Sequence, residues 1–124
     1  MLAKIALADA FSRFSDTWSP KIAADVNDMQ VKVAKLEGEF VWHHHENEDE
    51  LFLVVTGALR IELEDGAVEL GPGELVVVPR GVEHRPVALP RADVLLFEKA
   101  TTVNTGSATE SARTVTDVKR VTEL

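Results

Sequence analysis

Between residues 20 and 98 the apolar positions recur at every second residue or in short unbroken runs. Leu59, Ile61 and Leu63 alternate with polar residues, a pattern typical of a strand with one buried face. Three other runs are apolar at every position: 51–55, 75–78 and 94–97. Strands of that kind must be covered on both faces, either inside a sandwich or at a contact between subunits.

Turn sequences separate these runs. Asp65-Gly66 lies between two alternating stretches and predicts a tight hairpin. Further turns are indicated where Gly or Pro interrupts the pattern: 37–38, 56–57, 71–73, 79–81 and 89–90. About eight or nine short strands with such turns are typical of an all-β sandwich or barrel, which is the fold class we predict.

Both ends of the chain depart from this pattern. Leu7, Phe11 and Phe14 recur at helical spacing, which predicts a short helix over residues 5–14. After Ala100 the sequence is rich in threonine, and we expect a loop or a poorly ordered stretch over 101–111. A second short helix is predicted at 118–124, with Thr116 as its N-cap.

These boundaries divide the chain into three parts of one domain: a helical arm at 1–19, a barrel at 20–99, and a tail at 100–124 that packs on the barrel or extends from it.

The charge and composition then exclude several classes of function. A formal net charge of −8 would repel nucleic acid and anionic membranes, so we expect neither as a partner. No apolar run approaches the roughly 20 residues that cross a bilayer, and no signal peptide is visible. The absence of cysteine excludes disulfides and thiol nucleophiles and suits the cytoplasm, where we expect the protein.

The candidate chemistry lies in two stretches, 42–50 and 79–86, which contain all four histidines. On an extended strand His43 and His45 share one face, while His44 points to the other. Glu50 begins the next predicted strand and His84 follows a Pro-x-Gly turn, so one more carboxylate and one more imidazole can join the pair. Three imidazoles and one carboxylate suit a first-row divalent metal, although a lone His-x-His pair is more often an incidental surface feature.

The spacing of these residues resembles the first motif of the cupin family. Gly38 is followed by His43-x-His45, then by four residues and Glu50, then by six residues and Gly57. The gap after Gly38 is four residues where the family usually has five.

The second stretch is similar to the second cupin motif. Gly73, five residues, Pro79-x-Gly81, two residues and His84 follow the family pattern, whereas Ala88 stands where asparagine is usual.

The resemblance implies a small single-domain (type 2) cupin, of the kind often labelled mannose-6-phosphate-isomerase-like, with a double-stranded β-helix, or jelly-roll-like, barrel and often dimeric. It implies one divalent transition metal per chain, of which iron, manganese, nickel and zinc stay open. By this resemblance the metal ligands are His43, His45, Glu50 and His84.

The residues expected to face inward are apolar: Val31, Val33, Val41, Phe52, Val54, Val82 and Leu96. Such a lining suits a small, partly apolar molecule. Lys35 is the one inward cation we expect, and a solvated position at the strand end is its simpler interpretation. Arg80 and Arg85 are expected to face out, so no sugar-phosphate pocket is evident.

The opposite face carries Trp42, Leu51, Leu53 and Val55, a stripe large enough to need a cover. We expect a homodimer to cover it, and the alternative is that the N-terminal helix and the tail do so within one chain.

Three functions stay open at this stage: a metalloenzyme such as a dioxygenase, isomerase, lyase or decarboxylase, a non-enzymatic binding or sensing module, and a structural barrel whose site is vestigial. Intact ligands argue against the third. No general base can be named outside the ligands, since Glu48 and Asp49 lie on a turn where acids are usually solvated.

Overall fold

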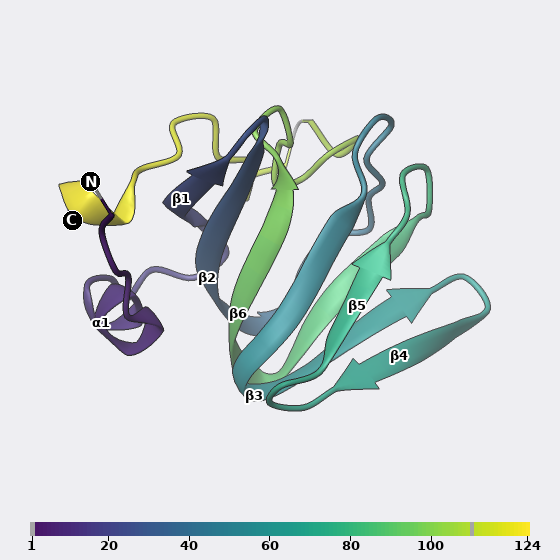
Figure 1. Ribbon diagram of the computed structural model, residues 1–124. Coiled ribbons are helices and arrows are strands. Elements are labelled where there is room, and N and C mark those ends of the chain that lie inside the picture. Colours follow the sequence, from purple (N-terminus) through teal and green to yellow (C-terminus); the bar gives the residue numbers. More distant parts are fainter. Residues whose placement is uncertain (1, 110) are drawn as a thin grey trace.

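The computed structural model describes residues 2–109 and 111–124, and β-strands dominate it (Figure 1). Residues 1 and 110, which fall in the predicted arm and tail, lie outside the described part. The elements in chain order are α1 (Leu7–Ser12), β1 (Lys21–Val26), β2 (Met29–Glu39), β3 (Glu50–Leu63), β4 (Gly66–Leu70), β5 (Leu75–Val78), β6 (His84–Lys99) and the 3-10 turn η1 (Val121–Glu123). The predicted all-β class is confirmed.

Two long strands, β3 and β6, organise the barrel because each of them runs through both layers. Their first contact joins the start of β3 to the end of β6, from Leu51 opposite Phe97 to Gly57 opposite Ala92. β2 and then β1 extend this layer beyond β6, and β5 extends it beyond β3. Their second contact joins the end of β3 to the start of β6, and β4 flanks it.

The strand count was too high because two predicted turns lie inside these long strands. Thr56-Gly57 bends β3 between the layers, and Leu89-Pro90 lies within β6. At Gly57, with φ +85°, an added Cβ would lie 2.1 Å from the Arg91 carbonyl oxygen, so only glycine allows the strands to approach there. The Asp65-Gly66 hairpin is present, with Leu63 opposite Gly66.

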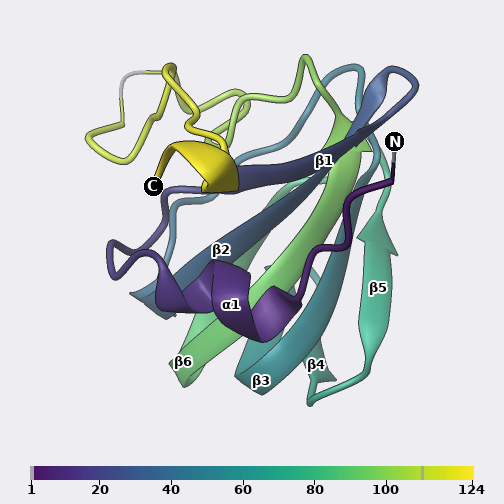
Figure 2. The same ribbon diagram turned by 60° about the vertical axis from the view of Figure 1, so that its left-hand side comes forward.

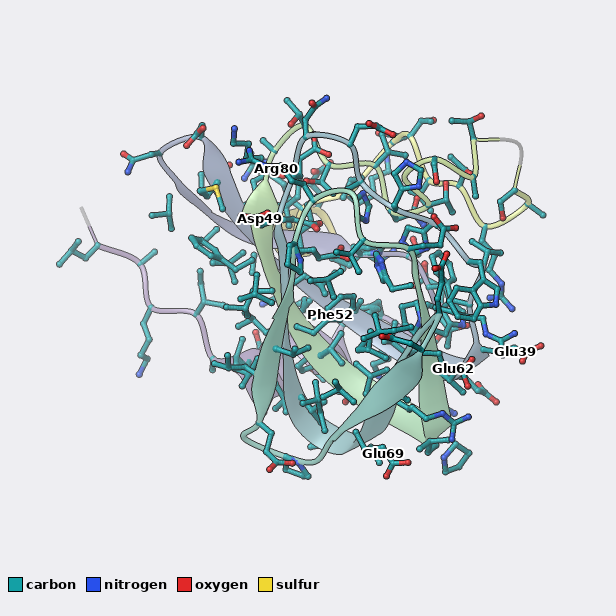
Figure 3. The ribbon with its side chains drawn as sticks, turned by 90° about the vertical axis from the view of Figure 1, so that its right-hand side faces the viewer. Glu39, Asp49, Phe52, Glu62, Glu69 and Arg80 are labelled. Atoms are coloured by element: carbon teal, nitrogen blue, oxygen red, sulfur yellow. The ribbon has the colours of Figure 1, made fainter. Side chains whose placement is uncertain are left out.

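The main hydrophobic core fills the space between the layers. Phe52 lies near its centre, whereas Glu39, Glu62 and Glu69 lie at the periphery (Figure 3). The inward prediction was wrong for Val31 and Val33, because β2 turns its even-numbered positions to the interior. Val33 instead belongs to a second cluster on the outer side.

Through the residues of that second cluster, α1 packs against the outer face of the sheet (Figure 2). Phe11 of the helix and Phe14, just after it, pack with Val33 of β2 and with Val121 of the tail. The helix is shorter than predicted, Leu7–Ser12 in place of 5–14.

The C-terminal helix is reduced to the single turn η1. Residues 119 and 120 are extended alongside β1, since Ile22 N–H donates to the Lys119 carbonyl at 2.9 Å and Ile22 forms a parallel bridge with Arg120. A helical turn can therefore begin only at Val121. Its N-cap is Arg120 and not Thr116, the residue predicted for that position. Among the helices in the described residues, none is long and apolar enough to cross a membrane.

Candidate metal centre

Local pairing brings the four predicted site residues together inside the barrel. His43 and His84 form an antiparallel bridge in which each backbone N–H donates to the other's carbonyl, at 3.0 and 2.9 Å. His45 follows on the same face, and Glu50 opens β3 beside it. One ligand atom from each of the four residues lies within 4.8 Å of the other three, and no residue in the group is more than 4% exposed.

Backbone carbonyls orient two of the imidazoles. His43 Nδ1 lies 2.9 Å from the Val41 oxygen, and His84 Nδ1 lies 2.9 Å from the Val82 oxygen. An Nδ1–H that donates to a carbonyl leaves Nε2 as an unprotonated acceptor, which is the form that binds a metal. Burial, together with the neighbouring His84, lowers the pKa of His43 to about 4, so its ring is neutral at pH 7.

Three of the candidate ligand atoms are buried without any hydrogen-bond partner: His45 Nε2, His84 Nε2 and Glu50 Oε1. The other ring nitrogen of His45, Nδ1, is also buried without one. Glu50 Oε1 lies 3.4 Å from His45 Nε2 and 3.6 Å from His84 Nε2. Leaving such groups desolvated and unpaired is costly. A divalent cation accepts all three lone pairs, and three nitrogens with one carboxylate oxygen form a donor set that zinc, iron, nickel and manganese all accept. The residues present therefore fit a metal.

Most of the remaining polar residues of the segment 44–49, here called the His loop, have structural contacts. His44 points away from the cluster, and the hydrogen bonds that its ring donates to the Glu46 and Glu83 carboxylates raise its pKa. Thr101 Oγ1 donates to Glu48 at 2.9 Å. Arg80 N–H donates to Asp49 at 2.9 Å, and the two residues lie side by side in Figure 3.

The tail closes over this loop. Ser107 N–H donates to the His44 carbonyl at 2.9 Å, and His44 N–H donates to Ser107 Oγ at 3.0 Å. Gly106 lies against the same segment, where an added Cβ would be 2.2 Å from the His44 oxygen. The tail thus packs on the barrel at the end that holds the cluster.

A small cavity of about 30 Å³ adjoins His43 and Glu50. Its walls are mostly apolar and include Phe52 and Leu96, as predicted. Trp18 and Phe40 are stacked at 4.5 Å between ring centroids and also line it. Of the other residues predicted to face inward, Val54 is in the core, and Val41 and Val82 pack against it.

Sequence analysis missed two charged residues of the interior. Lys32 is 3% exposed and Glu98 is 2% exposed, and Lys32 Nζ lies 3.0 Å from Glu98 Oε1. Burial and the negative charge of Glu50 raise the pKa of Glu98 well above its usual range. Lys35, the candidate for an inward cation, lies on the outer face with its ammonium 5.5 Å from the Phe14 ring centroid, in line with the simpler interpretation that it does not face inward. The available signal was the position of Glu98 at the end of an apolar strand.

Comparisons with known proteins agree with this geometry. The sequence model of the family described as Cupin domain matches residues 29–97. A cupin-2 domain containing protein from Shewanella frigidimarina has a crystal structure that is 44% identical, with a TM-score of 0.75 over 77% of this chain and 93% of that chain. The structure of NMB1881 from Neisseria meningitidis is 28% identical, with a TM-score of 0.72 over 79% of this chain and all (100%) of that chain.

A curated relative, the uncharacterized protein YdbB of Bacillus subtilis, is 40% identical over 76 residues, which are 60% of this chain and 67% of YdbB. The double-stranded β-helix that the motifs implied is confirmed by these likenesses.

Proposed function

The chain belongs to the cupin family, and from that premise we propose that it holds one divalent transition metal in its barrel and binds or transforms a small organic molecule beside it. The proposed ligands are His43, His45, Glu50 and His84. The metal, iron, manganese, nickel or zinc, would act as a Lewis acid on an oxygen atom of that molecule.

One observation carries the proposal: three buried atoms of the cluster point at one another and have no partner within the protein. Burying these atoms without hydrogen bonds costs free energy, and a cation bound to all of them would offset that cost. The carbonyl contacts to His43 and His84 add to the support, because they fix both rings in the metal-binding tautomer.

The role of the protein side chains is to bind and to exclude water. The apolar walls formed by Phe52, Leu96 and the Trp18–Phe40 pair suit a small, partly apolar molecule. A phosphate-bearing sugar is not favoured, because the interior lysine, Lys32, is already paired with Glu98. A non-enzymatic binding module is the second candidate, favoured by the engagement of the loop acids Glu48 and Asp49 in contacts with the protein.

We also propose that the protein is a cytoplasmic homodimer without a nucleic-acid or membrane partner. α1 covers the Val55 side of the outer stripe, but Leu75 and Val77 of β5 are 57% and 47% exposed. β5 is paired with β3 along one edge, and a second copy that packs on the outer face of β5 would cover Leu75 and Val77.

Zinc titration of the purified protein by calorimetry tests the metal site. We expect about one ion per chain, and His84→Ala should weaken binding by about 100-fold or more. His44→Ala is the matched control, since His44 lies outside the cluster, and it should bind zinc as the unmodified protein does. Protein that binds no zinc, nickel, manganese or iron, or a His84→Ala variant that binds them unchanged, would contradict the proposal.

A further inference from the structure

Strand register places Glu98 beside the proposed metal ligand Glu50. Leu51 of β3 is opposite Phe97 of β6, so the next pair along the antiparallel ladder is Glu50 and Glu98, on the face that points inward. Gln30 of β2 is opposite Glu98 on its other side. Glu98 is not one of the four clustered ligands, yet it lines the same cavity as His43 and Glu50.

Lys32 occupies only one of the two carboxyl oxygens of Glu98. Its ammonium lies 3.0 Å from Oε1. Oε2 is buried without a hydrogen-bond partner. A metal on the four ligands would satisfy His45 Nε2, His84 Nε2 and Glu50 Oε1. Glu98 Oε2 would stay unpaired, as would His45 Nδ1 and Thr102 Oγ1, and of these three residues Glu98 is the one that lines the cavity. A buried ion pair of this kind stabilises a fold little compared with apolar residues, so stability alone does not explain why it is there.

The residues around Glu98 Oε2 indicate which chemical group would suit it as a hydrogen-bond partner. Leu96, Phe52 and Ala34 line the cavity beside Glu98 and offer no hydrogen bond, so a molecule bound in the cavity can supply the partner that Oε2 lacks. A hydroxyl group suits a carboxyl oxygen in either protonation state, because a hydroxyl both donates and accepts. The site would hold a divalent metal, the carboxyl groups of Glu50 and Glu98, and the ammonium group of Lys32. The charge balance of these groups favours a bound molecule that is neutral or carries one negative charge.

We propose that Glu98 Oε2 forms a hydrogen bond with a hydroxyl group of the molecule bound at the metal, which selects small α-hydroxy carbonyl compounds. Lys32 is the positioning residue that holds the carboxyl in place. The carbonyl or carboxylate oxygen of the compound faces the metal, and the hydroxyl on the next carbon reaches Glu98. This inference rests on the proposed metal site.

The test compares pairs of probes that differ by one hydroxyl: lactate against propionate, and hydroxyacetone against acetone, each titrated into the full chain loaded with zinc. We expect the hydroxylated member to bind about tenfold more tightly. Because a hydroxyl can also bind zinc directly, the decisive comparison is between variants.

The double variant Lys32→Met with Glu98→Leu removes the ion pair without leaving one charge buried alone, so it should fold. It should bind zinc and lose the tenfold preference. Lys32→Met with Glu98→Gln returns a hydrogen-bonding group and should recover part of the preference. Arg85→Met with Glu62→Leu removes a half-buried pair outside the cavity, 2.6 Å long, and should keep the full preference.

A preference that survives in the Glu98→Leu double variant overturns the inference, as does the absence of any preference in the unmodified protein. Loss of zinc from that double variant also overturns it, since Glu98 would then serve the metal. Failure of the unmodified protein to bind zinc is a different result, because it removes the metal site itself.

Discussion

At the scale of single residues, Gly106 shows how the tail bears on the metal centre. Its φ is +49°, and an added Cβ would lie 2.2 Å from the His44 oxygen and 3.0 Å from His45 Nδ1. We expect Gly106→Ala to push the His loop, lowering both the melting temperature and the affinity for zinc.

Gly73→Ala provides the control for this substitution, because Gly73 also has a positive φ, +81°, but no atom within 4 Å of an added Cβ. It should lower the melting temperature and leave zinc affinity unchanged. Equal zinc affinities for the two variants would show that the tail does not support the site.

His43 makes the stability of the metal-free protein depend on pH. Its pKa is about 4 in the folded chain and 6.5 ordinarily, so between these values the unfolded chain binds a proton that the folded chain does not. Stability should therefore fall as the pH drops from 6.5 to 4, by about 3 kcal/mol in all. Urea denaturation with a chelator present measures this. His43→Gln has no group to titrate there, and parallel curves for the two proteins would contradict the assignment.

Residue spacing was enough to predict that His43, His45, Glu50 and His84 lie together, but not that Glu98 lies beside them. The cluster depends on alternation within one strand and on two motifs, both of which are local. Glu98 meets Glu50 and Lys32 only through the registers of β2, β3 and β6, over a separation of 66 residues for the Lys32 pair. Registers across distant strands are not encoded in local alternation.

At the scale of elements, α1 stabilises the barrel from outside. Phe11 is 6% exposed and packs with Val33 and Val121. Phe11→Ala should lower the free energy of unfolding by about 3 kcal/mol. The number of zinc ions bound per chain should not change, since this cluster is separate from the metal centre. Ser12→Ala, at an exposed position of the same helix, is the control and should cost little. Equal losses in the two variants would contradict this role for Phe11.

The same helix explains the error in β2. Val31 and Val33 look like the buried face of a strand, and Val33 is indeed buried, but under α1 rather than in the barrel. The interior face carries Lys32. The charge of a lysine predicts a solvent-exposed position, and the ion pair with Glu98 explains why Lys32 is buried instead. When a strand is covered on both faces, hydrophobicity alone does not show which face points into the barrel.

At the scale of the whole molecule, the outer face of β5 should form the dimer contact. Leu75→Lys with Val77→Lys should convert a dimer into a monomer in size-exclusion chromatography with light scattering, because burying two ammonium groups is costly. Val68→Lys is the control, at a comparably exposed valine of β4, and should stay dimeric. Unmodified protein that elutes as a monomer, or a double variant that stays dimeric, would contradict the dimer proposal.

The most direct test of the metal site is a crystal of the zinc-loaded protein measured at the zinc absorption edge. We predict one anomalous peak per chain inside the barrel, about 2.0–2.2 Å from a nitrogen of His43, His45 and His84 and from an oxygen of Glu50. A peak elsewhere, or no peak in protein soaked with excess zinc, would contradict the assignment.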